Sequence, residues 1–426
     1  MLQPLTVLIG KSARLLARMR GGSGSAFPGL VAEKIDPGFV KRTLAQAPHG
    51  VVLVSGTNGK TTTTKMVVEL LTGQGMRVFT NRTGSNFTRG VAAALLGEVT
   101  IGGHLDADVA VLELDEAYAV KFAAQVPPRN ALLLNVMRDQ LDRFGEIDHT
   151  ADLLRQVAAR TTAGVVLNRE DPRVAALAQD VAPGVDVRYF GLSPQLLALF
   201  PSDDALHSTS PQEASDLPAD VELVRFFDDG ATYRMGGTEF TAPLQINGLY
   251  NLFNAAAAIA LTRQVRGANL DVDSLLSTLS QITPAFGRGE TIVVHGQPVE
   301  LVLVKNPGGF RLGLKSFAPE GYATMIAIND NYADGRDMSW LWDVDFTSLS
   351  DVGVDTVSGV RAYDMALRLT YDQVPHQTVS TDLTSALHEF LDRNPGVSKR
   401  IYCTYTAMLA LRRELARITE VKGIDE

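Results

Sequence analysis

The chain has 426 residues, of which 45% are hydrophobic and 20% are charged, and its formal net charge is −9. This length exceeds one ordinary core, so we expect a globular protein of two or three domains. The acidic balance argues against non-specific binding to nucleic acid, because a protein that binds the phosphate backbone needs a net basic face; a local basic patch is left open.

The first twenty residues predict a basic amphipathic helix. Together with the glycine-rich linker that follows it, this helix makes up an N-terminal segment over residues 1–45. Five large apolar residues recur in it at helical spacing, namely Leu5, Leu8, Ile9, Leu16 and Met19. Its basic residues follow the apolar ones, the reverse of a signal peptide, so we expect no export. We expect the apolar stripe to pack on the next domain; attraction to an anionic membrane surface is the alternative.

From about residue 48 the sequence alternates between apolar runs of strand length and helix-like segments. Four such runs are GVVLVSG (50–56), ADVAVLELD (107–115), RNALLLN (129–135) and AGVVLN (163–168). Short, continuously apolar strands are typical of a parallel sheet that is buried on both faces. We therefore expect an α/β fold in which the carboxyl ends of the strands form one ligand-binding edge.

The stretch SGTNGKTTTT follows the first of these strands and predicts a nucleotide site. Gly56 and Gly59 allow backbone N–H groups to turn around phosphate oxygens. Lys60 would supply a charge for the terminal phosphates, and the Thr61 hydroxyl can ligate Mg²⁺. Val54 stands where a standard phosphate loop begins with glycine, so the match is GTNGKT only. A glycine turn that merely caps a helix would not explain the Lys-Thr pair.

Acidic residues follow the next two strands. Glu113 and Asp115 end the second apolar run, and Asp139 and Asp142 follow the third. Each of them alone would be explained as a helix cap or a solvated charge. Because they share one edge of the sheet, they would together supply the hard oxygen ligands that Mg²⁺ requires.

These segments together resemble the ATP-binding middle domain of the Mur ligases, which join amino acids to peptidoglycan precursors. The matching stretches are GTNGKTTT, LELDEA, NVMRDQLDRFGE and GLYNLFNAAAA. Further along, LVKNPGGF, NDNYADGRDMSWLWDVDF and SGVRAYDMALRL resemble the C-terminal domain of the MurT family, the synthetase subunits of lipid II isoglutaminyl synthases. The resemblance runs from about residue 10 to the end of the chain.

The resemblance implies a Mur ligase-like phosphate-loop ATPase domain with a parallel-rich sheet over residues 46–284. It also implies a smaller, Rossmann-like α/β domain over residues 285–426, with ATP in the cleft between the two. We expect four strands of the second domain near residues 298–304, 322–329, 354–359 and 400–405.

Site residues follow from the same resemblance. Lys60 and Glu113 match catalytic positions, Asn251 matches an asparagine that contacts adenine, and Arg288 matches an arginine directed toward the γ-phosphate. Mg²⁺ would be held by Thr61 and Glu113. The phosphate loop would bind ATP through Gly56, Thr57, Asn58, Gly59, Lys60, Thr61 and Thr62.

Two departures from the family pattern concern metals. Gln140 stands where Mur ligases usually have a metal-associated histidine, and no lysine suited to carbamylation follows at an obvious position, so a second metal site is left unassigned. Some MurT proteins carry a four-cysteine zinc ribbon, but residues 192–235 contain no cysteine, so we expect no zinc.

The resemblance also implies a partner that supplies ammonia. The only cysteine of the chain, Cys403, lies in an apparent buried strand, which favours an inert thiol over a glutaminase nucleophile and suits the cytoplasm. A separate GatD-like glutaminase is therefore implied, and Asp337 matches the aspartate that orients its catalytic histidine. Asp334 or Asp343 could take that role, and Asp337 could instead cap a turn.

The reaction implied is ATP-dependent amidation of the α-carboxyl of D-isoglutamate in lipid II, through an acyl phosphate. The alternatives are an amino-acid ligase of the Mur or folylpolyglutamate type, which needs no glutaminase, and a nucleotide-gated scaffold. About fifty residues precede the phosphate loop, too few for a uridine-nucleotide domain, which fits a lipid-linked substrate. Since no apolar run approaches about 20 residues, we expect a cytoplasmic protein at the inner face of the plasma membrane, with at most peripheral contact.

Overall fold

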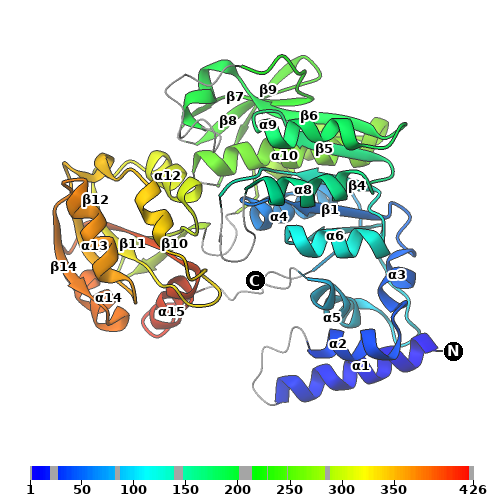
Figure 1. The fold of residues 1–426 in the computed structure, drawn as a ribbon, viewed down its shortest axis with the longest axis horizontal. Helices are drawn as coiled ribbons and strands as arrows, with labels where there is room; N and C mark the ends of the chain where they lie inside the picture. The colour runs from blue at the N-terminus through cyan, green and yellow to red at the C-terminus, as the bar shows by residue number, and fades with distance from the viewer. Residues whose placement is uncertain are drawn as a thin grey trace.

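The computed structural model describes residues 2–19, 27–81, 87–138, 147–200, 214–227, 229–246, 248–283 and 288–421. Of these, the side chains of residues 2, 17–19, 288 and 289 are outside the description. Two β-sheets, each with helices on both faces, account for most of the described chain (Figure 1). The predicted α/β class, with a parallel-rich sheet followed by a second α/β sheet, is confirmed.

The first sheet has nine strands in the order β2-β3-β1-β4-β5-β6-β7-β8-β9. Neighbours are parallel from β2 to β7, and β7, β8 and β9 extend the sheet as an antiparallel meander. The strands are β1 (Val51–Ser55), β2 (Val78–Thr80), β3 (Val109–Glu113), β4 (Asn130–Leu133), β5 (Gly164–Asn168), β6 (Asp186–Leu192), β7 (Val221–Phe227), β8 (Gly230–Met235) and β9 (Thr238–Pro243).

The first sheet has a hydrophobic core on each of its faces, because successive side chains of a buried strand point to opposite faces. Val52 and Val54 of β1 pack into a core with α4, α10 and α11, whereas Val51 and Leu53 pack with α5, α6 and α8. The helices around this sheet are α4 (Lys60–Gly73), α5 (Thr88–Glu98), α6 (Glu116–Gln125), α8 (Ile147–Ala158), α9 (Pro172–Ala176), α10 (Leu249–Arg266) and α11 (Val272–Leu279), with 3₁₀ helices η1 (Leu177–Asp180), η2 (Pro194–Leu199) and η3 (Gly267–Asn269).

The second sheet has six strands in the order β10-β11-β15-β12-β13-β14, and only the β10–β11 pair is antiparallel. One face packs on α12 and α13 and the other on α14 and α15. Its strands include those expected from the sequence: β10 (Arg288–Val294), β11 (Gln297–Leu303), β12 (Tyr322–Ala327), β13 (Val354–Ser358), β14 (His376–Ser380) and β15 (Ser398–Cys403). The helices are α12 (Pro307–Ser316), η4 (Ser339–Asp343), η5 (Thr347–Leu349), α13 (Ala362–Tyr371), α14 (Leu383–Asp392) and α15 (Tyr405–Leu415).

In the part of the chain that the structure describes, three helices precede the first strand, α1 (Leu2–Met19), α2 (Phe27–Ile35) and α3 (Phe39–Leu44). Most of the expected glycine-rich linker lies outside the described residues. The predicted helix at the N-terminus is present, and α1 and α2 pack on α5 at one end of the molecule (Figure 1). The prediction that its apolar stripe faces the next domain is wrong, because Leu5, Leu8 and Leu16 are exposed. Within the described ranges, no helix combines the length and the apolarity needed to cross a bilayer.

Candidate functional site

The turn between β1 and α4 lies where the chain changes direction across the first sheet. After β1 the chain builds β2 and β3 on one side of it and then crosses to β4 on the other, and ligands of α/β sheets bind at the carboxyl ends of strands at such a switch. Gly59 precedes α4 with a φ of 86°, and a Cβ there would lie 2.5 Å from Oδ1 of Asn254. Gly56 has a φ of 133°, and its Cβ would lie 3.0 Å from the backbone N of Asn135. Both positions therefore require glycine.

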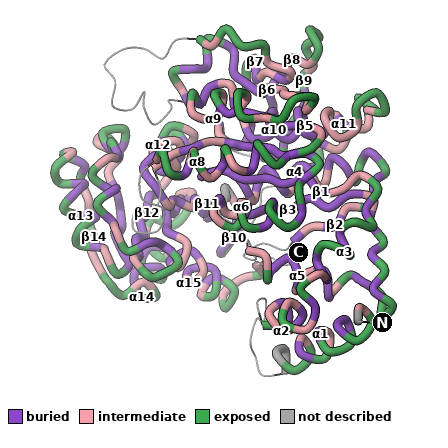
Figure 2. Tube along the Cα trace, turned by 45° about the vertical axis from the view of Figure 1, so that its right-hand side comes forward, coloured by how far each residue is buried: buried purple, intermediate pink, exposed green. Residues whose placement is uncertain are grey.

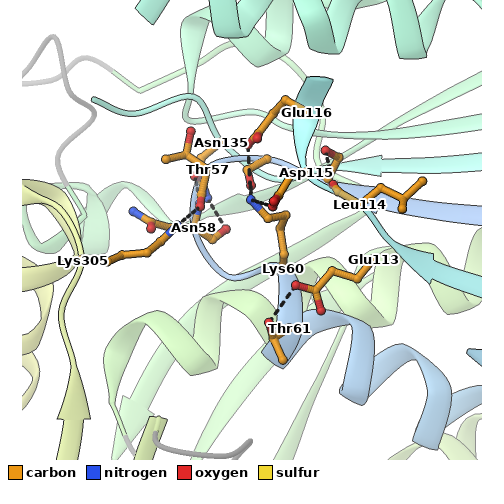
Figure 3. A network of polar contacts seen from close by, with 12 residues as sticks. Thr57, Asn58, Lys60, Thr61, Glu113, Leu114, Asp115, Glu116, Asn135 and Lys305 are labelled. Atoms are coloured by element: carbon orange, nitrogen blue, oxygen red, sulfur yellow. Dashed lines mark hydrogen bonds and ion pairs between the residues drawn. The ribbon is translucent and has the colours of Figure 1, made fainter. Parts of the chain in front are cut away.

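Lys60 begins α4 and projects its ammonium group among oxygens (Figure 3). Its Nζ donates to the carbonyl of Gly56 at 2.7 Å and lies 3.3 Å from Oδ1 of Asp115 and 3.4 Å from Oε1 of Glu116. Lys60 is 7% exposed and Glu116 is 3% exposed, whereas the Asp115 side chain is partly open to solvent. The site thus holds a buried cation beside the helix N-terminus, where a polyphosphate would lie.

Thr61 and Glu113 bring two hard oxygens together. The hydroxyl of Thr61 donates to Oε1 of Glu113 at 2.8 Å, and Glu113 is 4% exposed at the end of β3. Asn81, just after β2, positions this strand end, since its side chain accepts from the Glu113 N–H and donates to the Glu113 carbonyl. These donors fit Mg²⁺, which binds through one or two protein oxygens together with phosphate oxygens and water. No cluster of three or more His, Cys, Asp or Glu side chains suited to a metal occurs in the described ranges.

The loop after β4 holds the phosphate loop in shape. Asn135 accepts from the backbone N–H of Asn58 through its Oδ1 at 2.8 Å and donates to the Asn58 carbonyl at 3.0 Å. The carbonyl of Asn135 also accepts from the Thr57 N–H at 2.9 Å. Asp171, at the start of α9, accepts from the Val136 N–H at 2.7 Å, and burial raises the pKa of this carboxyl to about 6. Sequence reasoning missed Asn135 and Asp171, although both follow apolar strands.

Two residues between β11 and α12 reach from the second sheet to the phosphate loop. Lys305 donates from Nζ to the carbonyl of Thr57 at 2.8 Å. Asn306 and Asn58 exchange amide hydrogen bonds of 2.9 and 3.2 Å, and Asn306 is also the N-cap of α12, accepting from the Gly309 N–H. The sequence alone gave no reason to place them at the site, although Lys-Asn-Pro-Gly directly after a strand signals a polar helix start.

The two asparagines of α10 are placed differently. Asn251 is fully buried in the first turn of α10, and its contact with adenine stays a prediction. Asn254, which the sequence did not single out, lies against Gly59, and within the described structure its buried Nδ2 has no hydrogen-bond acceptor. An unsatisfied buried donor beside the phosphate loop fits an anionic ligand. Thr62 likewise is buried one residue beyond Thr61.

The side chains of three predicted site residues, and that of Gln140, are outside the described structure. Arg288 begins β10, but its side chain is outside the described residues, and Asp139, Gln140 and Asp142 lie outside them altogether. Their roles stay predictions.

The three aspartates considered for contact with a partner differ in their surroundings. Asp334 is 2% exposed, and its carboxylate accepts hydrogen bonds from the backbone N–H groups of Asn331 and Thr406, so it stabilises the fold. Asp343 pairs with Arg138 at 3.1 Å and thereby links the second sheet to the loop after β4. Asp337 precedes η4 and is partly exposed, and hydrogen bonds from Ser339 hold its pKa below the ordinary value. Asp337 thus differs from Asp334, which is buried, and from Asp343, whose carboxylate pairs with Arg138.

Comparisons with known proteins cover both halves of the chain. Residues 54–262 match the model of the Mur ligase middle domain, and residues 303–408 match that of the MurT ligase C-terminal domain. The lipid II isoglutaminyl synthase (glutamine-hydrolyzing) subunit MurT of Streptococcus pneumoniae is 32% identical over 97% of this chain and 96% of its own. The subunit of that name from Staphylococcus aureus strain COL is 28% identical over 99% of both chains.

Solved structures extend the likeness to the fold. The MurF ligase from Thermotoga maritima in complex with ADP superposes with a TM-score of 0.69, at 17% identity, covering 92% of this chain and 83% of that one. MurF from Acinetobacter baumannii gives 0.68 at 18% identity, over 92% and 81% of the two chains. The predicted Mur ligase-like fold is confirmed.

Proposed function

The chain belongs to the MurT family, and we propose that it is the synthetase subunit of a lipid II isoglutaminyl synthase. It uses ATP and ammonia to convert the α-carboxyl of D-isoglutamate in lipid II into an amide, so that the residue becomes D-isoglutamine. One observation carries the proposal: Lys305, from the half of the chain that matches the MurT domain, contacts the carbonyl of Thr57 in the phosphate loop at 2.8 Å. Relatives of that name also match over nearly the whole chain.

The chemistry follows from the charges around the phosphate loop. A carboxylate is a poor acyl donor, so its oxygen first attacks the γ-phosphorus of ATP, which gives an acyl phosphate and releases ADP. Ammonia then attacks the acyl carbon, and inorganic phosphate leaves. Lys60 and Lys305 would offset the negative charge that gathers during phosphoryl transfer. Mg²⁺, when bound at Thr61 and Glu113, would supply further charge neutralisation.

Ammonia must come from a second protein. Cys403 is the only cysteine of the chain, it is fully buried in β15, and burial raises the pKa of its thiol, so it is no glutaminase nucleophile. A GatD-like glutaminase subunit would release ammonia from glutamine. We assign to Asp337 the task of orienting the catalytic histidine of that partner.

The surface near Asp337 supports a protein partner. Tyr363, Leu367 and Tyr371 are exposed along one face of α13, at a spacing of four residues. Trp342, in the 3₁₀ helix that follows Asp337, stacks edge-on against Tyr371 with ring centroids 5.1 Å apart. Exposed tyrosine and tryptophan side chains are typical of the anchors of protein interfaces.

The division of the chain and its location complete the proposal. Residues 46–284 would form the ATP-binding domain and residues 285–426 the MurT-type domain, with the boundary in the segment between α11 and β10. The enzyme would act in the cytoplasm at the inner face of the plasma membrane, where its lipid-linked substrate is exposed.

Co-expression with a candidate glutaminase, followed by mass spectrometry of lipid II, tests the proposal. With glutamine and ATP, we expect each lipid II molecule to gain one amide only when both proteins are present. Asp337→Asn should abolish amidation from glutamine but preserve amidation from added ammonium, because the ligase site is intact. Incorporation of an amino acid without the glutaminase would instead establish the amino-acid ligase. If lipid II does not stimulate ADP release, the protein is not a ligase and the nucleotide-gated scaffold is the remaining alternative.

A further inference from the structure

The outer face of α1 carries a stripe of large aliphatic side chains. Its members recur at helical spacing and are between 37% and 62% exposed, namely Leu5, Leu8, Ile9, Leu15 and Leu16. Figure 2 shows exposed positions along this helix, which lies at the edge of the molecule, below α2 and α5 in Figure 1. These five residues form the α1 stripe.

Packing of the opposite face explains why the stripe points outward. Val7 and Ala13 are buried, and a Cβ on Gly10 would come within 2.6 Å of the Leu96 side chain of α5, so small residues allow α1 to approach α5 closely. Lys11 donates from Nζ to the carbonyl of Val99 at 2.7 Å, just beyond the C-terminus of α5, where backbone carbonyls lack helical partners. The inward face is therefore satisfied without the leucines.

The segment that carries the stripe has charged residues of one sign only. Although the whole chain has a net charge of −9, residues 1–32 contain no aspartate or glutamate. The basic residues of that segment are Lys11, Arg14, Arg18 and Arg20. Of these, Lys11 and Arg14 lie along the C-terminal end of α5, beside the stripe, since Lys11 contacts the Val99 carbonyl and Arg14 lies against Gly97. A helix with exposed aliphatic residues and basic flanks is the pattern of helices that lie in the interface of an anionic bilayer.

We propose that the α1 stripe docks on an anionic lipid bilayer and so holds the nucleotide site near its membrane-borne substrate. A bilayer fits better than a protein, because the stripe is purely aliphatic and lacks the tyrosine, tryptophan and arginine anchors of protein interfaces. The aromatic surface on α13 belongs to a different sheet and stays available for the partner. The inference rests on the proposed function only in that the substrate is lipid-linked.

Flotation with lipid vesicles tests the docking directly and without catalysis. The full chain is mixed with vesicles of phosphatidylglycerol and phosphatidylcholine, or with vesicles of phosphatidylcholine alone, at low salt. We expect binding to the anionic vesicles, and a loss of about tenfold in partitioning for Leu8→Gln/Leu16→Gln, because two leucines no longer enter the interface. Leu217→Gln/Val352→Gln, which changes two exposed apolar residues elsewhere, is the matched control and should float like the parent chain.

Three results would overturn the proposal. The parent chain could fail to bind anionic vesicles, the α1 variant could bind as well as the control, or the α1 variant could alter the oligomeric state or the capture of the glutaminase instead. Circular dichroism of the α1 variant checks its fold, and since both leucines are exposed, we expect an unchanged melting temperature.

An activity measurement separates this proposal from the proposed function. For the α1 variant, we expect the ratio of amidation of vesicle-embedded lipid II to amidation of a water-soluble headgroup analogue to fall about tenfold, in parallel with partitioning. An unchanged ratio would overturn the docking proposal. If the parent chain and glutaminase amidate neither substrate, the proposed function fails, whereas the vesicle result still decides the docking.

Discussion

Replacing Lys60 by methionine is expected to abolish ATP turnover and, separately, to destabilise the protein. Methionine keeps the length and the apolar stem of the side chain but removes its charge. Loss of one electrostatic donor to a transition state costs about 2.7–4 kcal/mol, or roughly a hundredfold to a thousandfold in kcat. The second effect arises because Glu116, whose side chain is 5% exposed, loses the cation 3.4 Å away. Removing one member of a buried ion pair costs about 3–5 kcal/mol.

We expect the stability loss to lie near the lower end of that range. Asp115, the other carboxylate beside Lys60, has a side chain that is 37% exposed, so water can replace the ammonium group there. The double variant Lys60→Met/Glu116→Gln removes the charge that the single variant leaves unpaired. It should recover most of the lost melting temperature while its ATP turnover stays abolished.

Two assays separate the effects. The melting temperatures of the parent chain, the single variant and the double variant, measured without nucleotide, show how much the ion pair stabilises the protein. The rate of ADP release in the presence of the glutaminase, glutamine and lipid II measures catalysis. ADP release by a folded Lys60→Met protein at more than about a tenth of the parent rate would refute the catalytic role. A double variant no more stable than Lys60→Met would refute the assignment of the stability loss to Glu116.

Three further predictions concern other parts of the site and the core. Lys305→Met should lower kcat/KM for ATP about a hundredfold, since its ammonium lies beside the phosphate loop, whereas Lys315→Met, on the exposed side of α12, should leave it unchanged. Folding raises the pKa of Asp171 from 3.8 to about 6, so the unfolded chain loses this proton at a lower pH than the folded chain does. The free energy of unfolding of the parent chain, relative to that of Asp171→Asn, should therefore fall by up to about 3 kcal/mol between pH 4 and pH 7. Denaturant unfolding measures this difference, and a rise over that range would contradict the prediction. Cys403 should react with a thiol reagent at pH 8 only after unfolding, and rapid labelling of the native chain would show that its burial is incomplete.

Several features of this protein follow from the sequence by itself. The four apolar runs predict buried parallel strands, because only strands covered on both faces are apolar at every position. Glycines at positions 56 and 59 followed by Lys-Thr predict the loop, since positive φ angles and a phosphate-binding lysine are properties of local residues. These predictions depend on residues within one strand or one turn, and the structure has both elements there.

Only the tertiary structure decided which distant residues meet at that loop and which face of α1 is outside. Lys305 and Thr57 are 248 positions apart, and no local pattern encodes the crossing of the chain that brings them within 2.8 Å. The three candidate aspartates look alike in the sequence, but only burial and hydrogen bonding distinguish Asp337 from Asp334 and Asp343. For α1 the periodicity predicts an amphipathic helix and assigns its apolar stripe to the core. The small residues opposite approach α5 more closely than leucines could, so packing turned the stripe toward the outside.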